Sequence, residues 1–591
     1  MTQRSEGGSR RRGRILAGCL ALFLVLIIGR LVQLQLVEGA QWRALAAAVQ
    51  ERQIELPPRR GSITDRDGTL LAFDVKATAI AVDGYNMTKP ETLLSILAEE
   101  LGETRQALSD LVYRASYFTW IDRAVDLETA QRIRERAGEA GAHGLIFFDA
   151  WKRCYPQGRL ASNLIGFVGL DGVGLEGIEL AHDDALRGTP TRLHVVEGAD
   201  GRTYQTRTID PGTPGQDIQL TIDAGLQFAC EEEIEEGVAA FQANGGMIVV
   251  LDPSSGDVLA MAQDKGFDLN AFWTSTAEER KNLATSFLFE PGSIFKAFTG
   301  LAALDAGVVS VDDVFDGNDG IEITGHDMHN ADFISYGTVT FAEIIEHSVN
   351  TAMIRVAFQL GVDPFYEALV DLGFGQATGI ELPGEEEGIL RPPTAWTPLD
   401  LAAASIGQSV AVTGLQLARG VAAIANDGLL PPIHILAQED ASTSSSNRVT
   451  DPEIADTMCS LMERVVRSGT GTLAAIPGFS VAGKTGTAQK ATPGRGYVDE
   501  KYTSLFAGIL PADDPQYVVV VVLDEVKTAT VSGGYTAGQI FRATATRLIH
   551  TERVPSTSTD TYEVGSAVVV SASPQGQAQS GQSLFGRPQT P

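Results

Sequence analysis

The sequence predicts an α+β protein with an apolar N-terminal helix, an extended α+β domain and a larger α+β domain in which helices cover a mainly antiparallel sheet. Residues 15–36 form a nearly uncharged run after a basic cluster. Residues 37–225 mix short strand-like runs with helical patterns and contain many Gly and Pro residues. Residues 226–550 contain strand pairs that are bracketed by helices. This order is typical of α+β domains.

The N-terminal segment has the composition of a membrane anchor. A basic cluster at residues 10–14 precedes the apolar run 15–36, which is interrupted by Arg30 and two glutamines. A helix of this length spans a bilayer core of about 30 Å, and Arg30 near its outer end can reach the interface. Because basic residues stay inside, we expect residues 1–14 in the cytoplasm, one pass through the cell membrane and an extracytoplasmic catalytic domain. A signal peptide cleaved near residues 44–48 is the alternative.

The overall composition argues against a nucleic-acid partner. The 591 residues are too many for one core, so two or three domains are expected. The formal net charge of −30 would repel phosphate, and we interpret it as a solvated acidic surface. The cysteines have no metal-ligand or redox spacing. Their spacing leaves a bridge between Cys154 and Cys230 open, but we do not expect one. The tail, residues 551–591, is rich in Ser, Thr, Gln and Pro, which predicts disorder.

The first domain after the anchor contains short elements. A short helix is predicted over residues 41–52. A hairpin follows, because Asp67-Gly68 is a turn signal between strand-like runs. Two longer helical patterns lie further on, at residues 90–101 and 127–139.

The second domain contains a hairpin, a helix and a buried strand in that order. Strand-like runs at residues 247–251 and 258–262 flank a turn of Asp, Pro, Ser and Gly residues. Apolar residues recur at helical spacing over residues 294–304. The Val-rich run at residues 517–523 predicts a buried central strand.

The first motif with chemical meaning is Pro291-Gly292-Ser293-Ile294-Phe295-Lys296. Ser293 falls at the start of the predicted helix, and Lys296 lies one turn further on the same face. A serine needs an adjacent base to act as a nucleophile. The helix N-terminus also favours negative charge that develops beside Ser293. Alone, the motif is also compatible with a solvated Ser and Lys.

The second motif is Ser348-Val349-Asn350, which lies 55 residues after Ser293 (348 − 293). It precedes an apolar helical pattern over residues 351–360. A hydroxyl at Ser348 can relay a proton between nucleophile, base and leaving group, and the Asn350 amide can hold a substrate carbonyl. Taken alone, either side chain is more simply a helix N-cap.

The third motif is Lys484-Thr485-Gly486-Thr487, which lies 136 residues after Ser348 (484 − 348). The alternation of Phe479, Val481 and Ala482 before it indicates a strand. Gly486 would let a substrate backbone lie against that strand. The two threonines offer hydroxyls to a carboxylate, and the lysine supplies positive charge. A strand edge with a polar turn is the alternative.

The three motifs, in this order, match the S-x-x-K, S-x-N and K-T-G set of the penicillin-binding proteins and class A β-lactamases. From the apolar segment to about His550 the chain resembles class B penicillin-binding proteins. The form of residues 175–179 and the lack of C-terminal repeats are most similar to the septal (division) branch. Other segments that resemble signatures of this family are residues 60–72, 153–158, 220–223, 330, 336–337 and 379–385.

This resemblance implies a peptidoglycan DD-transpeptidase of septal wall synthesis. Its catalytic residues would be Ser293 as nucleophile, Lys296 as base, Ser348 and Asn350. Its substrate-binding residues would be Lys484, Thr485, Gly486 and Thr487. The backbone amides of Ser293 and Thr487 would form an oxyanion hole, and burial and Lys484 would lower the pKa of Lys296. No metal and no other cofactor is implied. The implied partners are D-Ala–D-Ala stem peptides, β-lactam antibiotics, membrane lipid, a SEDS-family glycosyltransferase and other division proteins.

Other functions share parts of this pattern. A membrane-bound β-lactamase or β-lactam sensor has the same motifs, but class A hydrolases use a glutamate for deacylation. The glutamates at residues 385–387 lie 37 to 39 residues after Ser348 (385 − 348 and 387 − 348), without an asparagine at the hydrolase spacing. The intact motifs argue against an inactive scaffold. Within the family, an elongation-type enzyme is the alternative to the septal one. Since no glycan-polymerase pattern is found, a separate polymerase is expected.

Overall fold

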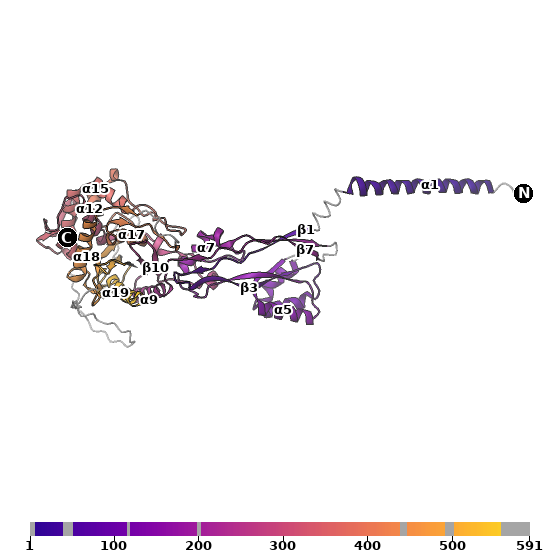
Figure 1. The fold of residues 1–591 in the computed structure, drawn as a ribbon, viewed down its shortest axis with the longest axis horizontal. Helices are drawn as coiled ribbons and strands as arrows, with labels where there is room; N and C mark the ends of the chain where they lie inside the picture. Colours follow the sequence, from indigo (N-terminus) through magenta and orange to yellow (C-terminus); the bar gives the residue numbers. More distant parts are fainter. Residues whose placement is uncertain are drawn as a thin grey trace, which may run out of the picture.

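The computed structural model describes residues 6–39, 51–114, 119–197, 203–437, 446–490 and 501–556. The molecule is elongated, and Figure 1 shows helix α1 at one end, strands such as β3 along the middle and a helix-rich part at the other end. The predicted α+β class is confirmed. We call the part from β1 to β8 the pedestal and the part from α9 to α19 the C-terminal domain. The domain bounds 37–225 and 226–550 stay predictions.

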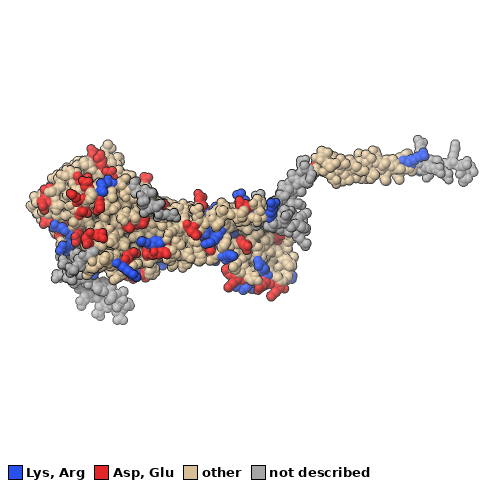
Figure 2. Space-filling view, in the orientation of Figure 1, with Lys and Arg blue, Asp and Glu red and all other residues tan. Residues whose placement is uncertain are grey.

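Helix α1 (Glu6–Val32) continues into a π-helical turn, Gln33–Val37. Within the described residues, Arg12–Val37 is the one helix that is long and apolar enough to cross a membrane. Figure 2 shows uncharged residues along this helix in that view, with basic side chains near its N-terminal end. Arg30 Nη1 lies 3.8 Å from Glu38 Oε1. The guanidinium therefore points toward the C-terminal end of the helix, as expected of an arginine that reaches the interface.

The pedestal consists of two sheets with helices on one of them. Its strands are β1 (Glu51–Leu56), β2 (Ile63–Thr64), β3 (Leu70–Val82), β4 (Thr119–Asp126), β5 (Leu145–Cys154), β6 (Thr191–Glu197), β7 (Thr203–Asp210) and β8 (Ile218–Gln219). Its helices are α3 (Pro90–Leu101), α4 (Arg105–Arg114), α5 (Leu127–Glu139), α6 (Ser162–Ile165), α7 (Gly177–Ala181) and α8 (Asp183–Arg187). Strand β3 pairs antiparallel with β2, β4 and β5, whereas β1, β6 and β7 form a separate antiparallel sheet.

Most local predictions for the pedestal are confirmed. The hairpin at Asp67-Gly68 is present, with Ile63 paired to Ala72 across it. The two predicted helices are α3 and α5, which pack their apolar residues on the sheet. The helix predicted over residues 41–52 is wrong at its end, because the last two residues pair with β6 as part of β1. The rest of that prediction lies outside the described residues. Cys154 and Cys230 are free thiols, as expected.

The C-terminal domain is built around a five-stranded antiparallel sheet in the order β10-β9-β19-β18-β17. Its strands are β9 (Gly245–Leu251), β10 (Val258–Gln263), β17 (Ala482–Gln489), β18 (Tyr502–Leu510) and β19 (Tyr517–Asp524). The Val-rich run forms the central strand β19, as predicted. Its side chains alternate between two apolar cores, so the strand is buried on both faces. Strand β17 lies at the end of the sheet order and carries the third motif.

Helices cover both faces of this sheet. Helices α9 and α19 pack on one face, and α17 and α18 pack on the other. The helices of the domain are α9 (Ala224–Ala240), α10 (Ala277–Arg280), α11 (Leu283–Ser286), α12 (Phe295–Asp305), α13 (Phe341–His347), α14 (Asn350–Leu360), α15 (Val362–Asp371), α16 (Pro398–Ser405), α17 (Gly414–Ala425), α18 (Pro452–Arg467) and α19 (Ala537–Glu552). Short strand pairs complete it: β11 (Val314–Asp316) with β14 (Thr338–Thr340), β12 (Ile321–Ile323) with β13 (His326–Met328), and β15 (Leu429–Leu430) with β16 (Asn447–Arg448).

The pedestal and the C-terminal domain share one hydrophobic core. Phe167 of the pedestal stacks on Phe272 of the C-terminal domain, with ring centroids 4.0 Å apart. A large apolar interface opposes relative motion of two domains. The pedestal is therefore a fixed support for the domain with the three motifs. Buried residues from both sides that belong to this core are Ile63, Leu160, Ile178, Met247 and Ile294.

A buried ion network stabilises the pedestal close to this junction. Glu179 is fully buried and accepts hydrogen bonds from Arg60 Nε at 2.6 Å, Arg153 Nε at 2.7 Å and Tyr155 Oη at 3.2 Å. Asp74 lies 3.3 Å from Arg153 Nη1. Burial raises the pKa of Tyr155 well above its ordinary value, so its hydroxyl stays protonated and donates to Glu179. The network connects three of the sequence segments on which the family resemblance is based.

Replacing Glu179 by alanine is expected to destabilise the protein by about 3–5 kcal/mol, because two buried guanidinium groups lose their shared carboxylate. Urea unfolding of the purified protein measures this loss. Glu91→Ala, which breaks an exposed ion pair with Arg105, is the matched control and should cost much less. Equal losses for the two variants would show that the buried network does not stabilise the pedestal.

Candidate active site

Ser293 lies in a turn that leads directly into a helix. The 3-10 turn Gly292–Ile294 continues into α12, so Ser293 lies at the N-terminal end of the helix, as the sequence predicts. Gly292 has a φ of +53°, and a Cβ on it would meet the carbonyl oxygen of Thr487 at 2.8 Å. Its amide donates to the carbonyl of Gly407 at 3.0 Å. Glycine is needed at this position because both the φ angle and the close contact exclude a larger residue. The turn thereby lies directly against strand β17.

Lys296 is fully buried and touches four oxygen atoms. Its Nζ lies 3.1 Å from Ser293 Oγ and 3.1 Å from Ser348 Oγ. It donates to the Ser348 carbonyl at 2.6 Å and to Asn350 Oδ1. These last two atoms can only accept hydrogen bonds. In a neutral amine they use both N–H bonds, so the lone pair faces the two hydroxyls. The arrangement suits a neutral base beside Ser293.

The electrostatic environment favours the neutral form of Lys296. Burial, and then the charge of Lys484, hold the pKa of Lys296 well below its ordinary value. The predicted direction of this shift and both of its causes are confirmed. Burial also lowers the pKa of Lys484 to about 7. Within the described residues, no carboxylate is a hydrogen-bond partner of either amine. An ammonium group at Lys296 therefore lacks a counter-charge.

Ser348 joins the two lysines. Its Oγ lies 3.1 Å from Lys296 Nζ and accepts a hydrogen bond from Lys484 Nζ at 2.9 Å. Ser348 ends α13 in a left-handed conformation with a φ of 58°. Val349 is the N-cap of α14, and no side-chain cap is present. The N-cap interpretation of Ser348 and Asn350 is therefore wrong, because the tight turn between the two helices directs both side chains toward the lysines.

A neighbouring segment fixes the side chain of Asn350. Asn350 Nδ2 donates to the carbonyl of His329 at 2.7 Å, which leaves Oδ1 to accept from Lys296. The next residue on α14, Thr351, donates its amide to Asn330 Oδ1 at 3.0 Å. Asn330 is itself buried. The start of α14 is therefore held by residues 329 and 330, and the amide orientation of Asn350 follows from these contacts.

The threonines of the third motif contact two glycine-rich loops. Thr485 Oγ1 lies 2.8 Å from Thr470 Oγ1. Thr487 Oγ1 accepts a hydrogen bond from the amide of Gly533 at 3.0 Å. Thr487 is exposed, whereas Thr485 is buried. Of the two hydroxyls, that of Thr487 is therefore the more accessible to a ligand.

Gly486 has a different neighbour from the one that the sequence predicted. A Cβ on Gly486 would meet the carbonyl oxygen of Pro291 and Ile294 Cγ1, each at 2.9 Å. The glycine therefore makes room for the turn Gly292–Ile294, which contains Ser293 and which we call the nucleophile turn. We had expected it to make room for a substrate. The strand begins at Ala482, so residues 479 and 481 precede it and are not part of it.

The structure brings the three motifs together. Direct hydrogen-bond contacts join Ser293, Lys296, Ser348, Asn350 and Lys484, with Thr485, Gly486 and Thr487 on the same strand as Lys484. A hydroxyl beside a neutral amine, together with a second hydroxyl that can relay protons, can perform acyl transfer through serine. The contributions of His329, Gly407, Thr470 and Gly533 were not predicted. Three of them act through a backbone group and Thr470 acts through a hydroxyl on a distant loop, and the glycine-rich stretches are the one hint in the sequence.

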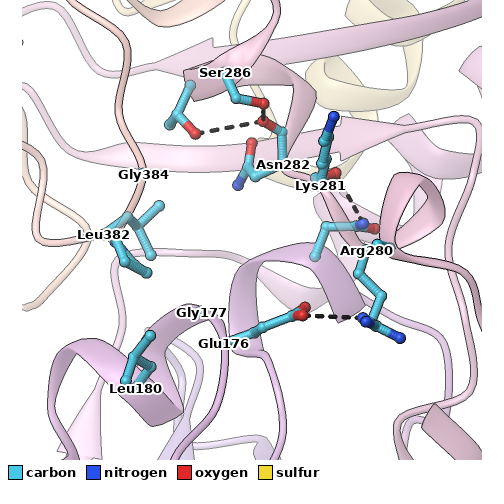
Figure 3. Close-up of a pocket in the computed structure, with 13 residues that line it drawn as sticks. Glu176, Gly177, Leu180, Arg280, Lys281, Asn282, Ser286, Leu382 and Gly384 are labelled. Carbon is cyan, nitrogen blue, oxygen red and sulfur yellow. Dashed lines mark hydrogen bonds and ion pairs between the residues drawn. The ribbon is translucent and has the colours of Figure 1, made fainter. Parts of the chain in front are cut away.

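A hollow lies at the junction of the pedestal and the C-terminal domain (Figure 3). Helix α7, the segment from Arg280 to Ser286 and the loop around Leu382 line it. Glu176 of the pedestal forms an ion pair with Arg280 across it, at 2.9 Å. None of the residues of the three motifs lines this hollow. It is therefore separate from the candidate active site.

Comparison with known proteins defines the class. The family model "Penicillin binding protein transpeptidase domain" matches residues 246–546, and "Penicillin-binding Protein dimerisation domain" matches residues 55–220. The first match alone covers about half of the chain. The chain therefore belongs to the penicillin-binding protein transpeptidase family, and its two domains and its relatives place it among the class B members. The resemblance found in the motifs is confirmed.

The relatives that it matches are similar over nearly their whole length. Penicillin-binding protein PbpB of Mycolicibacterium smegmatis is 32% identical, with 91% of this chain and 90% of that protein covered. Peptidoglycan D,D-transpeptidase FtsI of Escherichia coli is 30% identical, with 90% of each covered. The structure of penicillin binding protein 3 from Mycobacterium tuberculosis, complexed with aztreonam, matches with a TM-score of 0.66 at 28% identity over 85% of this chain and 98% of that one.

Replacing Lys484 by alanine is expected to move the acid limb of penicillin acylation to higher pH. The positive charge of Lys484 lowers the pKa of Lys296, so its removal raises that pKa, and the neutral amine is then lost at a higher pH. Acylation rates measured from about pH 4 to pH 9 give the limb. Lys484→Arg keeps the charge and is the control, with the limb near its wild-type position. A limb that does not move in Lys484→Ala contradicts the assignment of Lys296 as the titrating base.

Proposed function

We propose that this chain is a serine D,D-transpeptidase that crosslinks the stem peptides of peptidoglycan. The observation that carries the proposal is the contact of Ser293 Oγ with Lys296 Nζ at 3.1 Å, where two carbonyl-type oxygens occupy the N–H bonds of the amine. The family and the names of its relatives support a peptidoglycan D,D-transpeptidase. The contacts of Ser293 support the serine mechanism.

The first half-reaction would form an acyl-enzyme. Lys296 takes the proton of the Ser293 hydroxyl, and Oγ attacks the carbonyl of the penultimate D-alanine. The amides of Ser293 and Thr487 are proposed to bind the oxyanion, which is consistent with the close approach of Gly292 to Thr487. Ser348 lies between the two lysines and can pass the proton to the leaving amine. The C–N bond breaks and D-alanine leaves.

The substrate would be held by groups whose hydrogen bonds the protein does not fully use. The terminal carboxylate would be bound by Lys484, Thr485 and Thr487, on the edge strand of the sheet. Asn350 uses one N–H on His329 and its oxygen on Lys296. Its second N–H can donate to a carbonyl of the stem peptide. Gly486 contributes indirectly, because its lack of a side chain lets the nucleophile turn pack against the strand.

The second half-reaction would form the crosslink. The amine of a neighbouring stem peptide attacks the acyl carbonyl, a new amide bond forms and Ser293 Oγ leaves. The amine gives up a proton, and Ser293 regains one through Ser348 and Lys296. No net oxidation or reduction occurs, so the reaction needs no electron donor or acceptor.

The contacts of the site favour this function over a β-lactamase. Hydrolysis of the acyl-enzyme would require a base such as a glutamate beside Ser293. Glu385 instead accepts hydrogen bonds from Thr378 and Gly379 in its own loop, with the Thr378 amide at 2.7 Å. Glu386 and Glu387 are exposed. An inactive scaffold is disfavoured because the buried amine of Lys296 is costly to maintain without a use.

We propose that this chain is anchored in the cell membrane by one span. Helix α1 would be the single span, with the basic cluster in the cytoplasm and the pedestal and C-terminal domain outside. A reporter that is active in the cytoplasm should be inactive when it is fused after His550. The septal role and a SEDS-family glycosyltransferase as partner are supported by the likeness to FtsI and by the lack of a glycan-polymerase pattern. Contact would run through α1 and the pedestal.

Penicillin should form a stable adduct on the peptide that contains Ser293, because no carboxylate among the described residues forms a hydrogen bond with the Ser293 hydroxyl. Mass spectrometry after labelling with a fluorescent penicillin identifies the peptide. Ser293→Ala should abolish labelling and keep the thermal unfolding profile of the wild type. Rapid turnover of the antibiotic would favour the hydrolase, and labelling of Ser293→Ala would place the nucleophile elsewhere.

Depletion of the protein should block septation, because crosslinking at the division site would stop while sidewall synthesis continues. Cells are expected to become elongated or chained, as measured by microscopy with a fluorescent cell-wall label. Expression of Ser293→Ala should fail to restore division, whereas the wild-type chain should restore it. Round or swollen cells with normal septa would assign the enzyme to elongation.

A further inference from the structure

A buried carboxylate that the proposed reaction does not use lies two residues before Ser348. Glu346 Oε2 accepts hydrogen bonds from Arg464 Nε at 2.9 Å and Nη2 at 2.6 Å, and Oε1 accepts from Ser468 Oγ at 2.6 Å. Its side chain is 8% exposed. Burial raises the pKa of Glu346, but the hydrogen bonds from Ser468 and Arg464 outweigh burial and leave this pKa below its ordinary value. The group is therefore ionised and anchored to the end of α18.

The backbone beside Glu346 extends this contact to strand β17. The Glu346 carbonyl accepts from the amide of Thr470 at 3.3 Å. A Cβ on Gly469 would meet the same carbonyl oxygen at 2.2 Å, so this loop lies directly on the last turn of α13. Thr470 Oγ1 in turn lies 2.8 Å from Thr485 Oγ1. One continuous set of contacts thus joins helix α13, which ends at Ser348, to strand β17, which contains the third motif.

Ser348 needs such support for a geometric reason. Its hydroxyl must stay within hydrogen-bond reach of Lys296 on α12 and of Lys484 on β17, which are separate elements. Its φ of 58° is a strained conformation for a serine. Strain of this kind persists where the surrounding structure enforces it. Catalytic geometry also has to be held to within about 0.5 Å by the residues around it.

We propose that Glu346, Arg464, Ser468 and Thr470 form a brace that sets the position of Ser348 relative to Lys484 and so controls proton transfer at Ser293. These are positioning residues, since none of them contacts the reacting atoms. The inference rests on the proposed serine acylation and assigns to this loop and ion pair a role in its rate.

Arg464→Ala tests the brace, because Arg464 is half exposed and its loss leaves the core intact. The acylation rate with penicillin should fall roughly 10- to 100-fold, as expected of a displaced catalytic group. The acid limb of the rate should also move to higher pH, since Lys484 is the charged group that acts on Lys296 and would be held less closely to it.

Arg547→Ala is the matched control. Arg547 lies on α19, is 39% exposed and pairs with Glu232 at 2.6 Å and Glu233 at 2.7 Å. It should leave the rate and the limb unchanged.

Two further variants, Ser468→Ala and Glu346→Gln, decide the outcome if Arg464→Ala does not fold. Each should slow acylation and move the limb in the same direction. The effects of Ser468→Ala and Glu346→Gln should be strongly non-additive in the double variant, because both residues act through one contact. Wild-type rate and limb in the folded variants would overturn the brace. A wild-type protein that penicillin does not acylate on Ser293 would overturn the proposed function, and this inference with it.

Discussion

The active site depends on a buried lysine amine that has no carboxylate partner in the part of the chain that the structure describes. Burying an ammonium group without a counter-charge is expensive, and the group loses its proton instead. Lys296 is in this situation, with Lys484 as a second cation that disfavours its charge further. The two atoms that can only accept hydrogen bonds, the Ser348 carbonyl and Asn350 Oδ1, then fix where its lone pair points. The nucleophilicity of Ser293 follows from this one electrostatic constraint.

The rest of the fold keeps these groups at their distances. Ser293, Ser348 and Lys484 come from three elements that are far apart in sequence, and the antiparallel sheet with its two helical layers holds those elements in place. Glycines at Gly292 and Gly486 allow the nucleophile turn to lie directly on the edge strand. The pedestal shares its core with this domain, so it holds the active site rigidly at a distance from α1. A rigid pedestal also fixes the distance between helix α1 and the active site of an enzyme whose substrate is the cell wall.

Some features of the site could be predicted from the sequence because they are local. The helix after Ser293, the helix after Asn350 and the central strand β19 follow from periodicity in short windows. The left-handed turn at Ser348 could not be predicted, because serine has no preference for it and the tertiary structure enforces it. The N-cap interpretation failed for the same reason. His329 and Thr470 act through a backbone carbonyl and through a hydroxyl on a distant loop, and neither leaves a pattern in the sequence.

The charge on Lys296 decides whether Ser293 has a neutral base beside it, and this charge can be measured directly. NMR of the protein with labelled lysine side chains, assigned by comparison with Lys296→Arg, follows the titration of this amine with pH. We predict that Lys296 loses its proton at a pH far below that of an ordinary lysine amine, because burial and then the charge of Lys484 hold its pKa well below the ordinary value. A Lys296 amine that titrates at the ordinary lysine pKa of about 10.4 would contradict this prediction, because no neutral base would then be available to Ser293.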